Sequence, residues 1–290
     1  MGGFGPTRKT LGWISLAALA AGILGPVSGC DTTSQDLNSL AKSFAPPTPR
    51  QAAEKMLNPH DPDDRREGTL LIANAPFGGS PPYLRTYRDY VEHEQDPLAK
   101  AAAVRALAKH GTAEDAPLIA RQLTHENVQV RWEAAKGLQR IHNPQVVRDL
   151  LEVLRDPEER LDVRVAAARA LGQYREDRVF QGLVAALDAR QLAVNAAAEQ
   201  SLETLTGQTL GRDPRPWLSW YNSATGDRFA AGLEYRYPTY QRRETWLEKL
   251  AFWTSRVVEQ PAPPVGLRPS SERRTYEDED ESTEHEQAGG

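Results

Sequence analysis

The sequence predicts an all-α fold, an α-α superhelical stack of about five helical hairpins closed by capping helices at its carboxyl end. One short pattern recurs at spacings of 35, 31, 33 and 31 residues. In each copy a basic or polar residue is followed after three positions by a small residue, and after four more by a large aliphatic one. Apolar runs at helical spacing precede most copies, as expected for hairpins that repeat.

Each position of the pattern has a physical role. The basic or polar position holds Arg65, Lys100, Arg131, Arg164 and Asn195. The small position holds Gly68, Ala103, Ala134, Ala167 and Ala198. The aliphatic position holds Ile72, Leu107, Leu138, Leu171 and Leu202. Residues four apart share one helix face, where the small residue admits a neighbouring helix and the aliphatic one fills the space between layers.

The apolar runs that precede the copies predict the first helices of the hairpins, at 83–94, 116–123, 146–154 and 179–187. Turn residues such as Asp96, Asp156 and Asp188 separate first from second helices. Short turns make the two helices of each pair antiparallel.

The repeated pattern resembles that of HEAT repeats, especially the short bacterial kind related to the repeats of phycobilisome-linked lyases. Residues 130–135 read Val-Arg-Trp-Glu-Ala-Ala and residues 163–168 read Val-Arg-Val-Ala-Ala-Ala, close to the family's Val-Arg-x-x-Ala-Ala. The resemblance covers about 61–207; the first copy departs at Gly68 and the last replaces arginine with Asn195. It implies a right-handed superhelix with second helices on the concave face, and arginines paired with the turn aspartate of a neighbouring unit.

The first 29 residues have the layout of an export signal, with Arg8 and Lys9 before an apolar run at 11–24. That run is too short for a membrane span, which needs roughly 20 residues. Val-Ser-Gly precedes Cys30, the only cysteine, and resembles a bacterial lipobox. We therefore predict a signal peptide at 1–29 and an acylated Cys30 that anchors the chain to a lipid membrane of the cell envelope, facing the periplasm or exterior. An ordinary signal with an incidental cysteine is the alternative.

The remaining chain divides by composition into a flexible tether at 30–50, the repeat solenoid at 51–207, a helical cap at 208–260 and a disordered acidic tail at 261–290. Residues 275–290 hold seven acidic side chains and no Lys or Arg. Since the net charge of the chain is −5, the rest carries +2. A nearly neutral folded part does not favour nucleic acid as a partner.

Two aromatic segments are assigned to the cap. Asp213 and Pro214 are typical of a helix start, and the following helix carries Trp217, Trp220 and Tyr221 on one side. We expect this side to cover the open end of the stack, with an aromatic ligand site as the alternative. The basic, tryptophan-bearing helix expected at 241–259 fits packing along the solenoid or, alternatively, a membrane interface.

No motif predicts catalysis. No two histidines lie three or four residues apart, and neither Gly-x-Ser-x-Gly nor a glycine-rich phosphate loop occurs. With Cys30 acylated, no thiol is left for a metal or a nucleophile. We expect no catalytic residue, metal site or cofactor, and hence a non-enzymatic scaffold that binds an unidentified protein. A bilin-lyase-like enzyme, by analogy with the related repeats, and a structural envelope protein are the alternatives.

The most distinctive surface feature is a column of positive charge on successive second helices. Arg105, Lys136 and Arg169 share one register, and Lys109 and Arg140 lie one turn further on. We call these five residues the basic stripe and predict that it binds an acidic partner, an ordinary solvated helix face being the alternative. We also hypothesise that the acidic residues between Glu277 and Glu286 compete for it.

Overall fold

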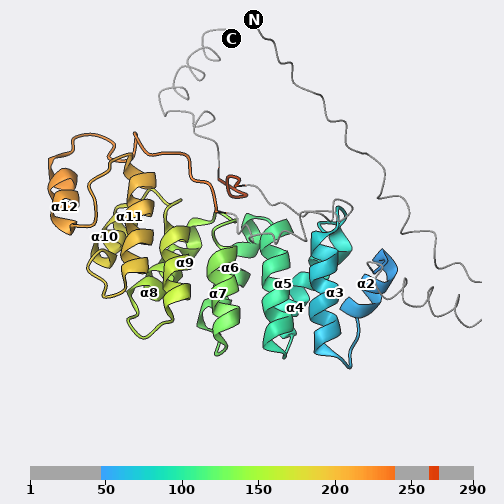
Figure 1. The fold of residues 1–290 in the computed structure, drawn as a ribbon. Coiled ribbons are helices and arrows are strands. Elements are labelled where there is room, and N and C mark those ends of the chain that lie inside the picture. The colour runs from blue at the N-terminus through green and yellow to red at the C-terminus, as the bar shows by residue number, and fades with distance from the viewer. Residues whose placement is uncertain (1–46, 239–260, 268–290) are drawn as a thin grey trace, which may run out of the picture. The chain divides into compact units, whose positions relative to one another are not determined.

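The computed structural model describes residues 47–238 and 261–267, and within them the chain forms five antiparallel helical pairs in sequence (Figure 1). The first helices are α2 (Pro49–Met56), α4 (Pro81–His93), α6 (Ala116–Ala120) with the 3-10 turn η2 (Arg121–Thr124), α8 (Val147–Arg155) after η3 (Pro144–Val146), and α10 (Asp177–Ala186). The second helices are α3 (Pro62–Asn74), α5 (Pro97–His110), α7 (Val128–Gly137), α9 (Leu161–Leu171) and α11 (Leu192–Thr206). Two short elements complete the helices described, η1 (Ala113–Asp115) and α12 (Pro214–Ser223).

The helical pairs stack in two layers. Each second helix packs against its own first helix and against the second helices before and after it, from α3 through α11. From α4 to α10, the first helices and their 3-10 turns pack against one another along the other layer. This arrangement confirms the predicted all-α solenoid of five hairpins. None of the helices in 47–238 or 261–267 is long and apolar enough to cross a membrane.

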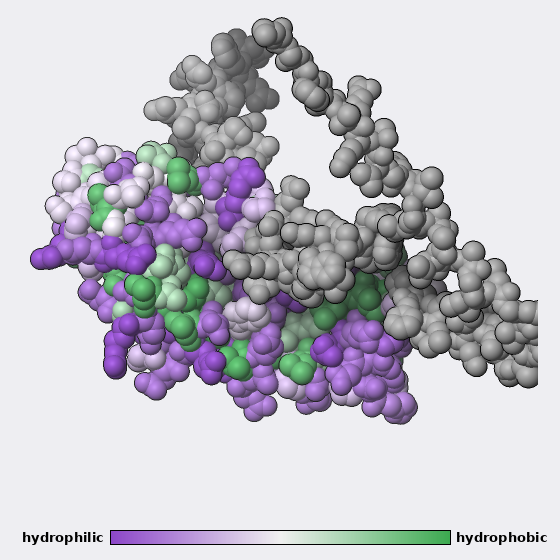
Figure 2. All heavy atoms as spheres, in the orientation of Figure 1, coloured by the Kyte–Doolittle hydropathy of each residue, from purple (hydrophilic) through white to green (hydrophobic). Residues whose placement is uncertain are grey.

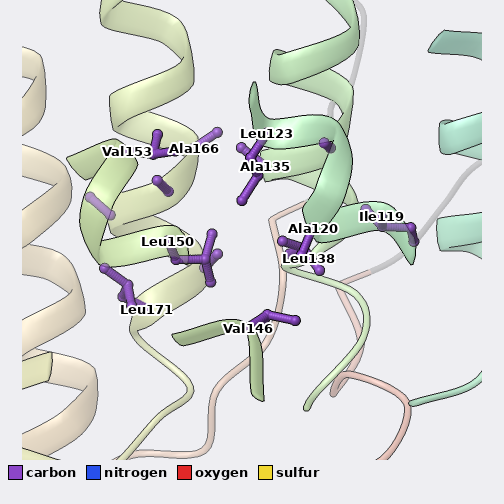
Figure 3. Packing of buried hydrophobic residues seen from close by; sticks show 14 of the residues in the cluster. Ile119, Ala120, Leu123, Ala135, Leu138, Val146, Leu150, Val153, Ala166 and Leu171 are labelled. Atoms are coloured by element: carbon purple, nitrogen blue, oxygen red, sulfur yellow. The ribbon is translucent and has the colours of Figure 1, made fainter. Parts of the chain in front are cut away.

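The core lies between the layers and follows the repeated pattern (Figure 3). The four alanines of the small position and all five aliphatic residues are completely buried. Gly68 is needed for close packing rather than being a weak copy, because a Cβ there would lie 2.2 Å from the backbone nitrogen of Met56 in α2. Every unit therefore has a residue small enough for the helix that crosses it.

Polar turn residues set the starts of the first three second helices. The carboxylates of Asp61 and Asp96 and the amide oxygen of Asn127 each accept a backbone N–H from the first turn of α3, α5 and α7. Such caps satisfy donors that have no partner inside a helix. In α9 and α11, Arg160 and Gln191 occupy this position without a side-chain cap.

The repeated basic residues link adjacent turns. Arg131 donates to the backbone oxygen of His125 in its own turn at 2.8 Å. It also donates to both carboxylate oxygens of Glu159 in the next turn, at 2.7 and 2.9 Å. Arg65 makes the same link to Glu94, at 2.7 and 2.9 Å. The fork of a guanidinium suits such two-sided contact.

The partners of these arginines differ from the turn aspartates that the family resemblance implies. Asp96 already accepts the N–H groups of Leu98 and Ala99 as a helix cap. A glutamate placed just before the cap has the reach to meet the arginine instead. Arg164 meets the amide oxygen of Gln191 at 3.0 Å. Asn195 donates within its own unit, to the backbone oxygen of Leu187.

Helix α12 covers the end of the stack. Asp213 caps it and Pro214 lies in its first turn, as predicted. Trp217 is completely buried and donates to the backbone oxygen of Gly211 at 2.6 Å. The rings of Trp220 and Tyr221 lie 5.9 and 4.6 Å from that of Phe180 in α10. The cap helix expected at 241–259 lies outside the described residues.

After α12 the chain turns back along the solenoid as a non-helical strap, residues 229–238. The Leu233 N–H donates to the oxygen of Thr204 in α11 at 2.8 Å, and Arg175 donates to the oxygen of Gly232 at 2.9 Å. Residues 261–267, which we assigned to the acidic tail, continue this path, because Val265 forms a parallel bridge with Ile141. The region expected to be a helical cap thus includes an extended segment.

The arginine links predict that two substitutions differ greatly in how much they lower the free energy of unfolding. Arg131→Met leaves the Glu159 carboxylate, 7% exposed, without its partner, so we expect unfolding free energy to fall by about 2–3 kcal/mol. Arg148→Met removes a pair whose side chains are 80% and 61% exposed, and should cost less than about 1 kcal/mol. Urea unfolding measures both. Equal losses would show that the link between turns is not stabilising.

Candidate protein-binding groove

The structure brings all five residues of the basic stripe together in one groove of about 520 Å³. They come from three consecutive second helices and the turn after α7. Leu70 and Ala73 of α3, and Val165 and Ala166 of α9, contribute apolar lining. The groove therefore combines positive charge with an apolar surface, a combination that fits amphipathic protein segments better than small polar molecules.

The middle of the groove is built around Trp132. The ammonium of Lys136 lies 4.1 Å from the centre of its ring, close enough for a cation–π interaction. Glu133 is buried beneath, 3.7 Å from Arg105 and 4.0 Å from Lys136. These contacts hold the two cations in place while Arg105 remains half exposed. Lys109 donates to the amide oxygen of Asn74 at 3.0 Å, which fixes it to the neighbouring unit.

Two carboxylates reduce the charge of the groove. Asp162 lines it, and Glu133 lies against its two central cations. Among the described lining residues, five cations face these two anions. The described lining therefore carries more positive than negative groups, which favours an acidic segment.

The strap forms one end of the groove. The Arg140 guanidinium lies 5.1 Å from the ring centre of Tyr237, and Pro238 is part of the lining. Tyr235 is buried beside the stripe, and burial raises the pKa of its phenol above the usual range. Its hydroxyl has no hydrogen-bond partner among the described residues. A neutral, buried phenol here anchors the strap through packing.

Sequence reasoning missed the strap as a wall of this groove. Residues 229–238 carry no helical periodicity, and their role depends on contacts with α9 and α11 that are distant along the chain. The alternation of Leu233, Tyr235 and Tyr237 with charged residues is the one signal of an extended segment that the sequence offers.

His110 at the end of α5 and His142 after α7 join neighbouring units. His110 Nε2 lies 2.7 Å from the backbone oxygen of Ala73. His142 stacks on Tyr174 with ring centres 4.8 Å apart, and its Nδ1 lies 3.2 Å from Gln173 Oε1. Burial lowers the pKa of His142. Its backbone N–H also donates to the oxygen of Val265 at 2.8 Å, so this ring lies where residues 261–267 attach to the solenoid.

Within residues 47–238 and 261–267, no three His, Cys, Asp or Glu side chains gather as a metal site would require. Cys30, the predicted acylation site, and the acidic residues from Glu277 lie outside the described residues. Another pocket of the described residues, lined by residues within 123–131 and 152–159, has about 400 Å³ and is predominantly acidic.

A comparison with family models matches residues 116–203 to HEAT repeats. These residues are similar to HEAT repeats. The match spans the third to fifth helical pairs, and the pairs α2–α3 and α4–α5 stack in the same way before it. The described chain is thus a HEAT-like solenoid, and the basic stripe runs along its second helices.

Solved structures similar to the HEAT solenoid include an engineered protein, at 18% sequence identity and a TM-score of 0.41, covering 53% of this chain and 76% of that one. Another is human deoxyhypusine hydroxylase in complex with glycerol, at 18% identity and a TM-score of 0.38, covering 53% and 72%. No curated protein matches the sequence.

His142 predicts a loss of stability in mild acid. Because folding lowers its pKa, the neutral ring contributes stability that is present above the unfolded pKa, about 6.5, and is lost as the pH falls toward the folded value. We expect the melting temperature to fall below about pH 6.5 and to fall less in His142→Phe, which keeps a ring against Tyr174. His93→Phe, at a site 68% exposed, is the control. Identical pH profiles for all three proteins would contradict this role.

Proposed function

We propose that this protein is a membrane-tethered HEAT-repeat scaffold of the bacterial envelope, which binds a partner protein through the basic stripe and acts without catalysis. The observation that carries the proposal is the convergence of five cations and an apolar lining in one groove. HEAT-type stacks offer extended surfaces to protein partners. The partner is expected to present an acidic segment with apolar side chains.

The composition of the surface supports this choice of site. Large hydrophobic residues exposed elsewhere include Leu98, Val128, Leu161 and Leu192, each in the first turn of a second helix. On the face seen in Figure 2, hydrophobic areas are separated by hydrophilic ones. Isolated apolar side chains are ordinary on a protein surface, whereas a groove with one predominant charge is a specific feature.

The membrane tether is proposed from the sequence around Cys30. Seventeen residues separate Cys30 from the Thr48 cap of α2. Such a segment spans at most roughly 60 Å. It would let the solenoid reach a partner in the same membrane while remaining anchored, provided that Cys30 carries more than one acyl chain.

If the stripe is the binding site, reversing its charge should abolish capture of the partner protein. A variant with Arg105→Glu, Lys136→Glu and Arg169→Glu should lose a specific protein in pull-downs from detergent-solubilised native membranes, because like charges repel an acidic segment. The matched control reverses Arg121, Arg148 and Arg178, all on first helices and 53–80% exposed. An unchanged set of captured proteins in the stripe variant would contradict the proposed site.

Acylation predicts that labelled fatty acid enters the wild-type chain in bacterial cells and is absent from Cys30→Ser. The wild type should fractionate with membranes, while the variant should be released, because the thioether-linked lipid supplies the anchoring free energy. Mass spectrometry of the amino-terminal peptide identifies the modified residue. Equal membrane association of both proteins would reject the anchor without affecting the groove.

A further inference from the structure

We propose that the basic stripe is occupied within the chain itself by the acidic segment between Glu277 and Glu286, which a partner must displace. The inference rests on the proposed function of the stripe as a site for acidic protein segments. The structure adds an observation that the sequence alone lacks: the position at which the acidic tail leaves the folded part of the chain.

The root of the tail is fixed beside the groove. The Val265 N–H donates to the backbone oxygen of Arg140 at 2.9 Å, and the His142 N–H donates to the oxygen of Val265 at 2.8 Å. Arg140 is itself a member of the stripe and lines the groove. The tail therefore starts beside the middle unit of the stripe and not at a distant part of the solenoid.

A turn after this bridge sets the exit of the chain. The Leu267 N–H donates to the oxygen of Pro264 at 3.2 Å, and Gly266 has a φ of +87°, a conformation that favours glycine. A Cβ at Gly266 would lie 2.8 Å from the oxygen of His142. Gly266 thus allows this turn to lie close to the backbone of His142, in the segment after α7.

The length of the tail matches the length of the stripe. Ten residues lead from Leu267 to Glu277 and can span at most roughly 35 Å. Arg105, Lys136 and Arg169 lie on three consecutive second helices, and packed helix axes are about 8–10 Å apart, so the cations extend over roughly 20 Å. The segment from Glu277 to Glu286 is long enough to follow all of them.

The charges are complementary. The segment carries seven carboxylates and no Lys or Arg. Among the described residues, the groove carries five cations against Asp162 and the buried Glu133. Exposed ion pairs are individually weak and are screened by salt. A covalent tether compensates, because it holds the segment at an effective concentration on the order of millimolar. The contact should be reversible and open to a partner that binds more tightly.

The test measures binding of a fluorescent peptide with the sequence of residues 277–286 to the purified full chain in detergent, by fluorescence anisotropy at low and high salt. A tail-neutral full chain replaces the seven carboxylates by amides: Glu277→Gln, Asp278→Asn, Glu279→Gln, Asp280→Asn, Glu281→Gln, Glu284→Gln and Glu286→Gln. In that background, Arg105→Gln, Lys136→Gln and Arg169→Gln remove the three stripe charges that share one register. Arg121→Gln, Arg148→Gln and Arg178→Gln are the matched control. Circular dichroism verifies that each protein is folded.

The tail-neutral chain should bind the peptide in a salt-sensitive manner, and the wild type at least about tenfold more weakly, because its own tail competes. Removing these three stripe charges should abolish binding, whereas the control triple should retain it. Equal affinity of wild-type and tail-neutral chains would overturn the proposal, as would peptide binding that survives loss of the stripe or is absent from every chain.

A second measurement needs no substitution. Carbodiimide treatment of the wild type joins carboxylates to nearby amines, and should yield amide links between the tail and Lys109 or Lys136, identified by mass spectrometry. Links confined to other lysines would contradict the proposal. The pull-down distinguishes the proposed partner-binding function from the proposed occupation by the tail. If charge reversal abolishes capture of a partner but no chain binds the peptide, the scaffold function is supported and the tail contact is rejected.

Discussion

Each helical hairpin of this chain buries its apolar face only against the next hairpin, and the rest of the structure depends on that constraint. The small residue of each copy decides how closely the next helix can approach. At Gly68 even a methyl group would collide with the backbone of α2. Ala134 and Ala167 are completely buried at the equivalent position. Stability is consequently a sum over neighbouring contacts, and both ends of the stack require a cover.

Two kinds of polar contact make the stacking specific. Arg65 and Arg131 join their own turn to a buried glutamate of the next turn, which sets the register between units along one edge. On the opposite edge, Gln173 donates to the backbone oxygen of Leu138 at 2.8 Å and supports His142. Because both kinds of contact cross from one unit to the next, they orient second helices relative to each other. This orientation of the second helices places the side chains of the stripe at equivalent positions in successive units.

The groove thus arises from the stacking of the helices and from the identity of a few side chains that line it. Helical stacking aligns Arg105, Lys136 and Arg169, and Trp132 provides a flat surface against which Lys136 lies. The strap closes one end and brings the root of the acidic tail to Arg140. In the proposed scaffold, a segment whose charge is opposite to that of the stripe would control access to it without a catalytic group.

The sequence by itself determined the helical pairs, the small and aliphatic positions, the cap at Asp213 and the shared register of the stripe, because periodicity along a helix and turn chemistry are local properties. Only the tertiary structure decided that Glu94 and Glu159, and not turn aspartates, meet the arginines. It also decided that the strap runs back to α7 and that Val265 pairs with Ile141. These contacts join residues far apart in the chain, and their partners depend on helix packing and side-chain reach, which no local pattern records.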